Sequence, residues 1–97
     1  MDEQFELHKI NFIWDHKKSK TNLAKHGISF EQAAEAFFDP FIKIVDASRN
    51  QEMRDAIIGM DKQWNLLFVV HIAFEDDRIR VISARKVTRS EKYFYEN

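Results

Sequence analysis

The sequence of 97 residues contains no cysteine, only one proline and only two glycines. Without cysteine, no disulfide bond can hold the fold and no thiolate can act as a nucleophile or a metal ligand. No stretch has the composition of a linker or a low-complexity segment, so the length predicts one domain over residues 1–97. Residues 1–10 are polar and mixed in charge, and we expect them to be irregular.

Long apolar runs are also missing, since the longest extends only from Leu66 to Val70. A membrane-spanning helix needs about 20 predominantly apolar residues, and no segment resembles a signal peptide. We therefore expect a cytoplasmic protein that does not associate with membranes. Nine Phe, two Trp and two Tyr supply the apolar surface for one modest core.

The charges are balanced in number but not in position. The net charge is −1, yet residues 78–97 hold six Lys or Arg against two Glu, a local net charge of +4. Residues 46–77 hold three against seven, a local net charge of −4. A local basic segment can bind phosphate groups whatever the total charge. The C-terminal fifth of the chain is therefore a candidate anion-binding segment.

A first helix is predicted over residues 16–25. Asp15 is a favourable N-cap for it, because its carboxylate can accept hydrogen bonds from the free amides of the first turn. Gly27 suits the left-handed backbone conformation that commonly follows the end of a helix.

A second helix is predicted from Ser29 to about Phe38. Ser29 and Gln32 have the spacing of a capping box, and Asp39-Pro40 ends the helix. Its apolar residues recur at the helical spacing and form one buried stripe: Phe30, Ala33, Ala34 and Phe37.

The rest of the chain is predicted to be mostly strands joined by short polar turns, one of them over residues 47–52. Thr88 and Glu91 again have capping-box spacing, which predicts a short helix over residues 89–95. This order indicates an α+β fold, an antiparallel β-sheet with the N-terminal helix pair on one face and a short C-terminal helix. The predicted strands are 12–14, 41–46, 54–60, 64–74 and 77–88.

The strand at residues 77–88 has two different faces, because strand side chains alternate. One face carries Ile79, Val81, Ser83, Arg85 and Val87, which mostly suits a core. The other carries three cations, which favours an anionic partner. The alternative is that these charges protect a sheet edge from aggregation. The cations of this second face are Arg78, Arg80 and Lys86.

The preceding strand must be aligned with this one to predict a site. We expect Ile79 and Val81 to face the helices together with Leu66, Phe68, Val70, Ile72 and Phe74. His71 would then lie on the opposite face with Arg54 and Arg80. A register slip of one residue would reverse this assignment.

Several short motifs cover nearly the whole chain, from Phe12 to Tyr95. They are Phe12-x-Trp14-Asp15, Lys25-His26-Gly27-Ile28-Ser29-Phe30-Glu31, Glu52-x-Arg54, Ile58-Gly59, Leu67-x-Val69-Val70-His71, Arg78-Ile79-Arg80-Val81-Ile82-Ser83-Ala84-Arg85-Lys86 and Thr88-Arg89-x-Glu91. Together these motifs resemble the BrnT toxins of bacterial type II toxin–antitoxin systems. Two features depart from that family: Trp64-Asn65 stands where Gly-Arg is frequent, and the C-terminal tail has fewer arginines.

The resemblance implies a ribonuclease with a RelE-like fold that is toxic because it cleaves RNA. It also implies a partner, a neighbouring DNA-binding antitoxin of the BrnA type, and thus a toxin–antitoxin hetero-oligomer. An exposed cationic face is one place where such an antitoxin would bind. We expect it to cover some of Arg54, His71 and Arg80.

Metal-free cleavage of RNA requires a base for the 2′-hydroxyl proton, a cation for the phosphorane and an acid for the departing 5′-oxygen. His71 is the one histidine inside a predicted strand, and imidazole changes its charge near neutral pH. Arg54 and Arg80 are suitable phosphate ligands, because guanidinium binds phosphate oxygens in pairs. The alternatives are a hydrogen-bonded sheet histidine and surface ion pairs with Glu52, Asp55 or Asp77.

Further RNA contacts are predicted from the basic C-terminal segment: Arg78, Arg85, Lys86, Arg89 and Tyr93. The alternatives are that Lys86 is solvated and that Arg85 pairs with a carboxylate such as Glu31 or Asp15. His26 is a candidate for catalysis or for a helix C-cap, where the helix dipole favours a cation. Tyr93 and Tyr95 are candidates for stacking on a base or for acid catalysis, or they pack the last helix.

No cofactor and no metal site are expected, because no two histidines have helical i, i+4 spacing and Glu75-Asp76-Asp77 reads as an ordinary turn. Two other functions remain open. A module of the same fold could bind RNA or the antitoxin without chemistry. A DNA-binding regulator is less favoured, because the cations lie on a strand and a terminal helix and not on a helix–turn–helix.

Overall fold

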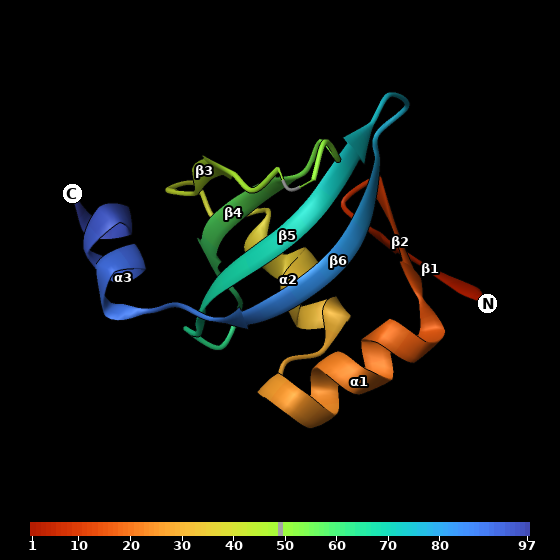
Figure 1. Ribbon diagram of the computed structural model, residues 1–97, viewed down its shortest axis with the longest axis horizontal. Helices are drawn as coiled ribbons and strands as arrows, with labels where there is room; N and C mark the ends of the chain where they lie inside the picture. The colour runs from red at the N-terminus through yellow and green to blue at the C-terminus, as the bar shows by residue number, and fades with distance from the viewer. Residues whose placement is uncertain (49) are drawn as a thin grey trace.

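The computed structural model describes residues 1–48 and 50–97, and these form a six-stranded sheet with the strand order β1-β2-β6-β5-β4-β3. Helix α2 lies behind the sheet in Figure 1, α1 runs beside β6, and α3 lies at the C-terminal end. The predicted α+β architecture is confirmed. The elements are β1 (Asp2–Leu7), β2 (Ile10–Asp15), α1 (His16–His26), α2 (Phe30–Ala36), β3 (Lys43–Asp46), β4 (Asp55–Met60), β5 (Leu66–Phe74), β6 (Arg78–Lys86) and α3 (Arg89–Glu96).

The sheet is mixed, so the prediction of a purely antiparallel sheet was wrong. Residues 11–13 of β2 pair in parallel with residues 78–80 of β6, whereas the other neighbouring strands are antiparallel. Parallel pairing needs a long connection, and most of the chain separates β2 from β6. In the predicted turn at residues 47–52, position 49 lies outside the described residues.

The prediction that residues 1–10 are irregular was also wrong. They form β1 and the turn into β2, with His8 and Lys9 at φ 50° and 69° in the turn. Phe5 and Leu7 alternate with polar residues, which is the signal of a half-buried strand. Phe5 packs against Trp14 with 6.0 Å between ring centroids. β1 therefore extends the sheet beyond β2.

The local helix signals are confirmed. Asp15 accepts a hydrogen bond from the amide of Lys18, and Gly27 has a left-handed backbone with φ 71°. Both predicted capping boxes form, at Ser29 and at Thr88. Helix α2 ends at Ala36, two residues before the predicted end. Among the described residues, no helix is long and apolar enough to cross a membrane.

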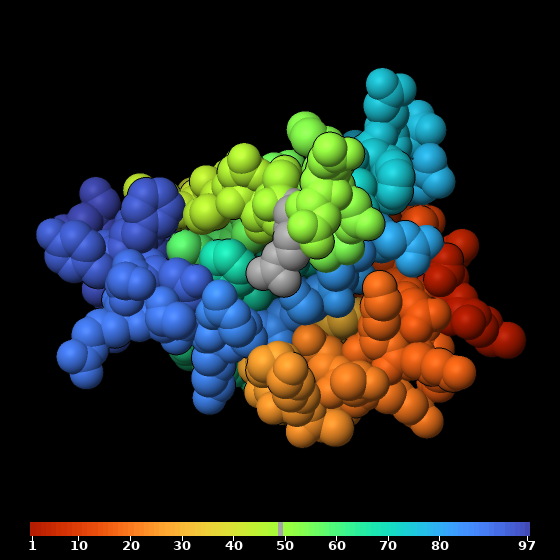
Figure 2. All heavy atoms as spheres, in the orientation of Figure 1, coloured from red at the N-terminus to blue at the C-terminus, as the bar shows by residue number. Residues whose placement is uncertain are grey.

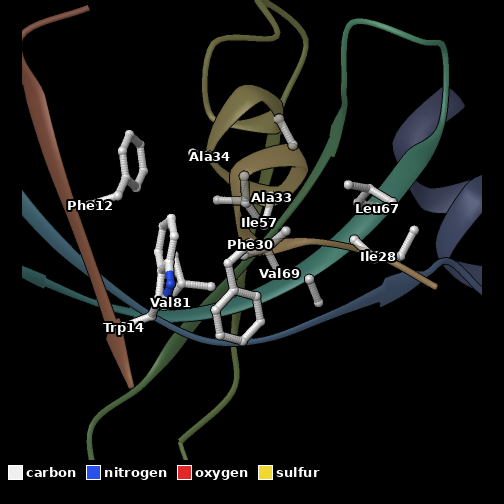
Figure 3. Packing of buried hydrophobic residues seen from close by; sticks show 12 residues of the cluster. Phe12, Trp14, Ile28, Phe30, Ala33, Ala34, Ile57, Leu67, Val69 and Val81 are labelled. Atoms are coloured by element: carbon white, nitrogen blue, oxygen red, sulfur yellow. The ribbon is translucent and has the colours of Figure 1, made fainter. Parts of the chain in front are cut away.

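The core lies between α2 and the sheet, as Figure 3 shows. Side chains from β2, β4, β5 and β6 meet the apolar stripe of α2 there. Phe30 of α2 is fully buried and packs edge-on against Trp14, with 5.7 Å between ring centroids. The buried members are Phe12, Trp14, Ile28, Phe30, Ala33, Ala34, Ala36, Ile57, Leu67, Val69, Val81 and Ala84.

Gly59 allows α2 to approach β4 closely. A Cβ atom at this position would lie 2.4 Å from the backbone oxygen of Ala36, which cannot move without shifting the helix. We therefore predict that Gly59→Ala lowers the free energy of unfolding by about 2 kcal/mol, the usual effect of overpacking a tight core. Urea denaturation of parent and variant measures this difference. An unchanged midpoint would show that α2 can shift at no cost.

A bulge in β6 decides which side chains face the helices. Val70 pairs with Ser83 but His71 pairs with Val81, so Ile82 is the extra residue and the alternation of β6 reverses there. Ile79 and Val81 face the helices as predicted. Beyond the bulge it is Ala84 that does so, and Ser83 and Arg85 lie on the opposite face.

The predicted alignment of β5 was wrong by one residue. Leu67, Val69 and His71 face the helices, with 0%, 0% and 5% of their surface exposed. Their neighbours Phe68 and Val70 lie on the opposite face, because they pair with Arg85 and Ser83. The sequence favoured neither alignment, since both sets of β5 side chains are apolar.

Candidate functional site

The sheet face opposite α2, which we call the open face, contains a hollow of about 390 Å³. We call it the arginine hollow, because Arg54 enters it from the start of β4 and Arg85 from the end of β6. Phe68 and Val70 of β5 form part of its wall with Ser83 of β6. The lining residues are Asp46, Ala47, Ser48, Arg54, Phe68, Val70, Ser83 and Arg85.

Arg85 is held in place on two sides. Its guanidinium forms two hydrogen bonds of 2.8 and 2.9 Å with the carboxylate of Glu91 in α3. It also lies over the ring of Phe68, 4.3 Å from the centroid. The hydrogen bonds with Glu91 raise the pKa of Arg85 and lower the pKa of Glu91 from their usual values. The predicted ion pair of Arg85 therefore exists, but its partner is Glu91 and not Glu31 or Asp15.

Arg54 is only partly satisfied by its neighbours. One of its terminal nitrogens pairs with the carboxylate of Glu52, as the ion-pair alternative predicted. Its Nε is buried and has no hydrogen-bond partner among the described residues. A buried donor without a partner is costly and uncommon. Arg54 is thus the member of the arginine hollow whose hydrogen bonding the described residues leave incomplete.

Arg80 does not reach the arginine hollow. Its guanidinium binds the carboxylate of Asp2 in β1, at 2.7 and 3.4 Å. The hydrogen bond with Asp2 raises the pKa of Arg80 and lowers that of the carboxyl group. Arg78 lies farther along β6, over the ring of Phe74 at 5.5 Å from the centroid. Both arginines lie on the open face, toward its β1 and β2 side.

His71 lies on the helix face, so the prediction that it shares a face with Arg54 and Arg80 was wrong. Its Nδ1 is 3.3 Å from the backbone oxygen of Val69, and its ring meets Phe37 edge-on at 4.8 Å between centroids. Burial lowers the pKa of His71 below its usual value of 6.5. These contacts match the alternative of a hydrogen-bonded sheet histidine.

The lowered pKa of His71 predicts a loss of stability in weak acid. As the pH falls through 6.5, the unfolded chain binds a proton at His71 more readily than the folded protein, which favours unfolding. We expect the melting temperature to fall less between about pH 7 and pH 5 in His71→Phe than in the parent. Thermal unfolding at several pH values measures this. An equal fall of the melting temperature in both proteins would contradict the lowered pKa of His71.

A second hollow of about 300 Å³ lies on the other side of Ser83, against α1. We call it the lysine hollow. Ser83 lines both hollows, and the bulge residue Ile82 lines the second. In Figure 2, β6 (blue) is visible between α1 (orange) and the residues preceding β4 (yellow-green). The lining residues are Lys17, Lys18, Thr21, Asn22, Lys25, His26, Ile82 and Ser83.

Sequence reasoning missed the lysines of α1 and Ser83. The lysines were assigned only to a helix, and Ser83 to the core-facing side of β6. The available signal was the composition of α1, whose sequence HKKSKTNLAKH contains four lysines and no carboxylate. His26 lies in the lysine hollow, and the adjacent Gly27 provides the helix C-cap.

The remaining predicted contacts lie outside both hollows. Lys86 pairs with Leu67 at the end of β6 and is exposed. Arg89 and Tyr93 are exposed on α3. Tyr95 donates a hydrogen bond to the carboxylate of Asp39, and burial together with this bond raises the pKa of Tyr95 to about 12. This hydrogen bond ties α3 to Asp39 and fits the structural alternative, in which Tyr95 packs the last helix.

No group of three or more His, Cys, Asp or Glu side chains that could hold a metal ion occurs in the part of the chain that the structure describes. The residues that line the arginine hollow include one carboxylate, that of Asp46. The amide and hydroxyl of Ser48 hold the pKa of Asp46 below its usual value. The hollow therefore combines two guanidinium groups with a charged carboxylate.

Comparisons with known proteins agree on one family. Residues 14–91 match the family described as "Ribonuclease toxin, BrnT, of type II toxin-antitoxin system". The fold is similar to the crystal structure of the Brucella abortus ribonuclease toxin BrnT, with a TM-score of 0.56 and 26% sequence identity, over 78% of this chain and 94% of that one. A search among curated proteins gives no match. The matched region includes both hollows and leaves out β1. The chain therefore belongs to the BrnT family of ribonuclease toxins of type II toxin–antitoxin systems.

Proposed function

We propose that this protein is a metal-independent endoribonuclease that cleaves RNA on the open face of its sheet and thereby inhibits growth. The observation that carries the proposal is the arginine hollow, where Arg54 and Arg85 converge within the region matched to the ribonuclease toxins. Guanidinium groups bind phosphate oxygens in pairs and stabilise the charge that develops on a phosphorane. We assign this part of the reaction to Arg54 and Arg85.

Proton transfer is assigned to His26. Among the residues that line the two hollows, it carries the only imidazole. It lies on the far side of Ser83 from the arginines, so a nucleotide placed over Ser83 would have guanidinium on one side and imidazole on the other. Imidazole can take the proton of the attacking 2′-hydroxyl, and the imidazolium that results can give a proton to the departing 5′-oxygen as the P–O5′ bond breaks. His71, on the helix face, is given no part in this step.

Cleavage in the presence of EDTA tests the proposal. The purified protein is incubated with an RNA oligonucleotide, and with the same oligonucleotide carrying a single 2′-deoxynucleotide at the cleaved position. We expect cleavage of the first and not of the second, because the attacking 2′-hydroxyl is missing. Binding of RNA without cleavage would instead support the non-catalytic module. Cleavage that stops in EDTA and returns with a divalent cation would overturn metal independence.

The antitoxin is proposed to act by covering the open face. The partner would be a DNA-binding protein of the BrnA type that forms a hetero-oligomer with this chain in the cytoplasm. Its binding would block access to Arg54. The family of toxin–antitoxin systems supports such a partner, and the exposure of both hollows supports the location. Addition of the partner should then abolish cleavage and protect the Arg54 side chain from modification by phenylglyoxal.

A further inference from the structure

Three arginines of the open face form ion pairs with carboxylates, but the lysines of α1 do not. Arg54, Arg80 and Arg85 form ion pairs with Glu52, Asp2 and Glu91. Among the described residues, no carboxylate pairs with any lysine of α1. Among the described residues that line the two hollows, the cations without a carboxylate partner are therefore lysines of α1. The four lysines are Lys17, Lys18, Lys20 and Lys25.

Asn22 fixes α1 beside β6. Strand β2 pairs with β6 only as far as Arg80, which leaves the edge of β6 without a strand partner beyond that point. There the side chain of Asn22 forms the hydrogen bonds with the backbone of β6 that a neighbouring strand would otherwise form. Its Nδ2 donates to the backbone oxygen of Ala84 at 2.8 Å, and its Oδ1 accepts from the amide of Ala84 at 3.1 Å. The lysines of α1 consequently have a fixed position relative to Ser83.

The bulge connects the two hollows. Ser83 and the unpaired Ile82 are placed at the point where the strand bends. Because Ser83 lines both hollows, they adjoin each other at β6, with α1 on one side and residues 46–48 on the other. A positively charged groove that follows the backbone is the usual feature of proteins that bind single-stranded nucleic acid.

We propose that the lysine hollow binds the phosphates of the nucleotides next to the cleaved bond, so that single-stranded RNA crosses β6 at Ser83. This inference rests on the proposed function and adds the path that the RNA strand follows over the protein. Lysine side chains bind phosphates as point charges and do not read the base. The lysine hollow therefore contributes affinity that is independent of sequence and decreases with salt.

The test is the salt dependence of RNA binding by the full chain. The probe is a fluorescently labelled 12-nucleotide single strand with 2′-O-methyl groups, which cannot be cleaved. The variant is Lys17→Gln/Lys18→Gln/Lys25→Gln, and glutamine preserves helix propensity. The matched control, Lys9→Gln/Lys62→Gln/Lys92→Gln, removes the same charge from exposed positions outside both hollows. Melting temperatures confirm that all three proteins are folded.

Each phosphate contact contributes about 0.7 to the slope of log affinity against log salt for a single strand. Removal of three contacts should lower the magnitude of the slope by about 2 and the affinity at 0.1 M salt by about 100-fold. The control should keep the slope of the parent. If the parent cleaves RNA but the α1 variant and the control both keep the slope of the parent, the lysine hollow does not bind phosphates. The proposed function then stands. If the parent neither binds nor cleaves RNA, both proposals fail.

Discussion

Replacement of Arg54 with methionine is expected to lower the rate of RNA cleavage by about 100-fold, the usual effect of losing one donor that stabilises developing negative charge. Arg54 lines the arginine hollow, and its buried Nε has no partner among the described residues. Methionine keeps most of the side-chain volume but cannot bind phosphate. The change should therefore act on the chemical step and leave the fold intact.

Single-turnover cleavage of a short RNA measures this effect separately from substrate binding. The matched control is Lys62→Met, which also removes one positive charge but from an exposed turn outside both hollows. We expect the control to cleave at the rate of the parent. A variant at Arg54 that is folded and cleaves within about threefold of the parent would exclude Arg54 from the site.

Replacement of Asn22 with leucine is expected to lower the free energy of unfolding by about 3 kcal/mol or more. Asn22 is 6% exposed and donates to the backbone oxygens of Ile28 and Ala84, while it accepts from the amide of Ala84. Leucine is similar in size but leaves these three backbone groups without partners. Each buried unsatisfied group costs about 1–3 kcal/mol.

Urea denaturation of the parent and the variant measures this loss. Thr21→Ala is a suitable control, because Thr21 is the exposed neighbour of Asn22 on the same helix. We expect that control to change the stability by less than about 0.5 kcal/mol. A loss below about 1 kcal/mol in the Asn22 variant would mean that water replaces its hydrogen bonds, and that α1 is not fixed to β6 in this way.

The helices could be predicted because their signals are local. Asp15, Gly27 and the capping boxes at Ser29 and Thr88 act on backbone groups within four residues, so their effect is visible in the sequence itself. The same holds for the approximate bounds of the strands. The β1 strand was missed because its apolar residues, Phe5 and Leu7, are few and lie among charges.

The candidate site depends on long-range features that the sequence does not show. An extra residue at Ile82 reverses the faces of β6, and nothing in that apolar and basic run marks the bulge. The bulge places Arg85 on the open face, and the alignment of β5 places His71 in the core. The ion pair of Arg80 with Asp2 joins residues 78 positions apart, and it could not be foreseen while β1 was taken as irregular.

The sequence predicts how charge is distributed along the chain, but not which of the charges are paired. The C-terminal fifth is basic, but the structure pairs Arg80 and Arg85 with carboxylates. Such pairs compensate part of the charge that the sequence count assigned to RNA binding. Among the described residues that line the two hollows, the lysines of α1 are the cations without a carboxylate partner. Which charges are compensated is a property of the fold.

The measurement that tests the account most directly is a methyl NMR titration with the uncleavable 12-nucleotide RNA. Val69 and Val70 are neighbours in the sequence, but Val69 is buried against the helices and Val70 lines the arginine hollow. If RNA binds the open face, the methyl signals of Val70 shift and those of Val69 do not. Shifts of the Val69 methyl signals, with those of Val70 unchanged, would contradict the open face as the site.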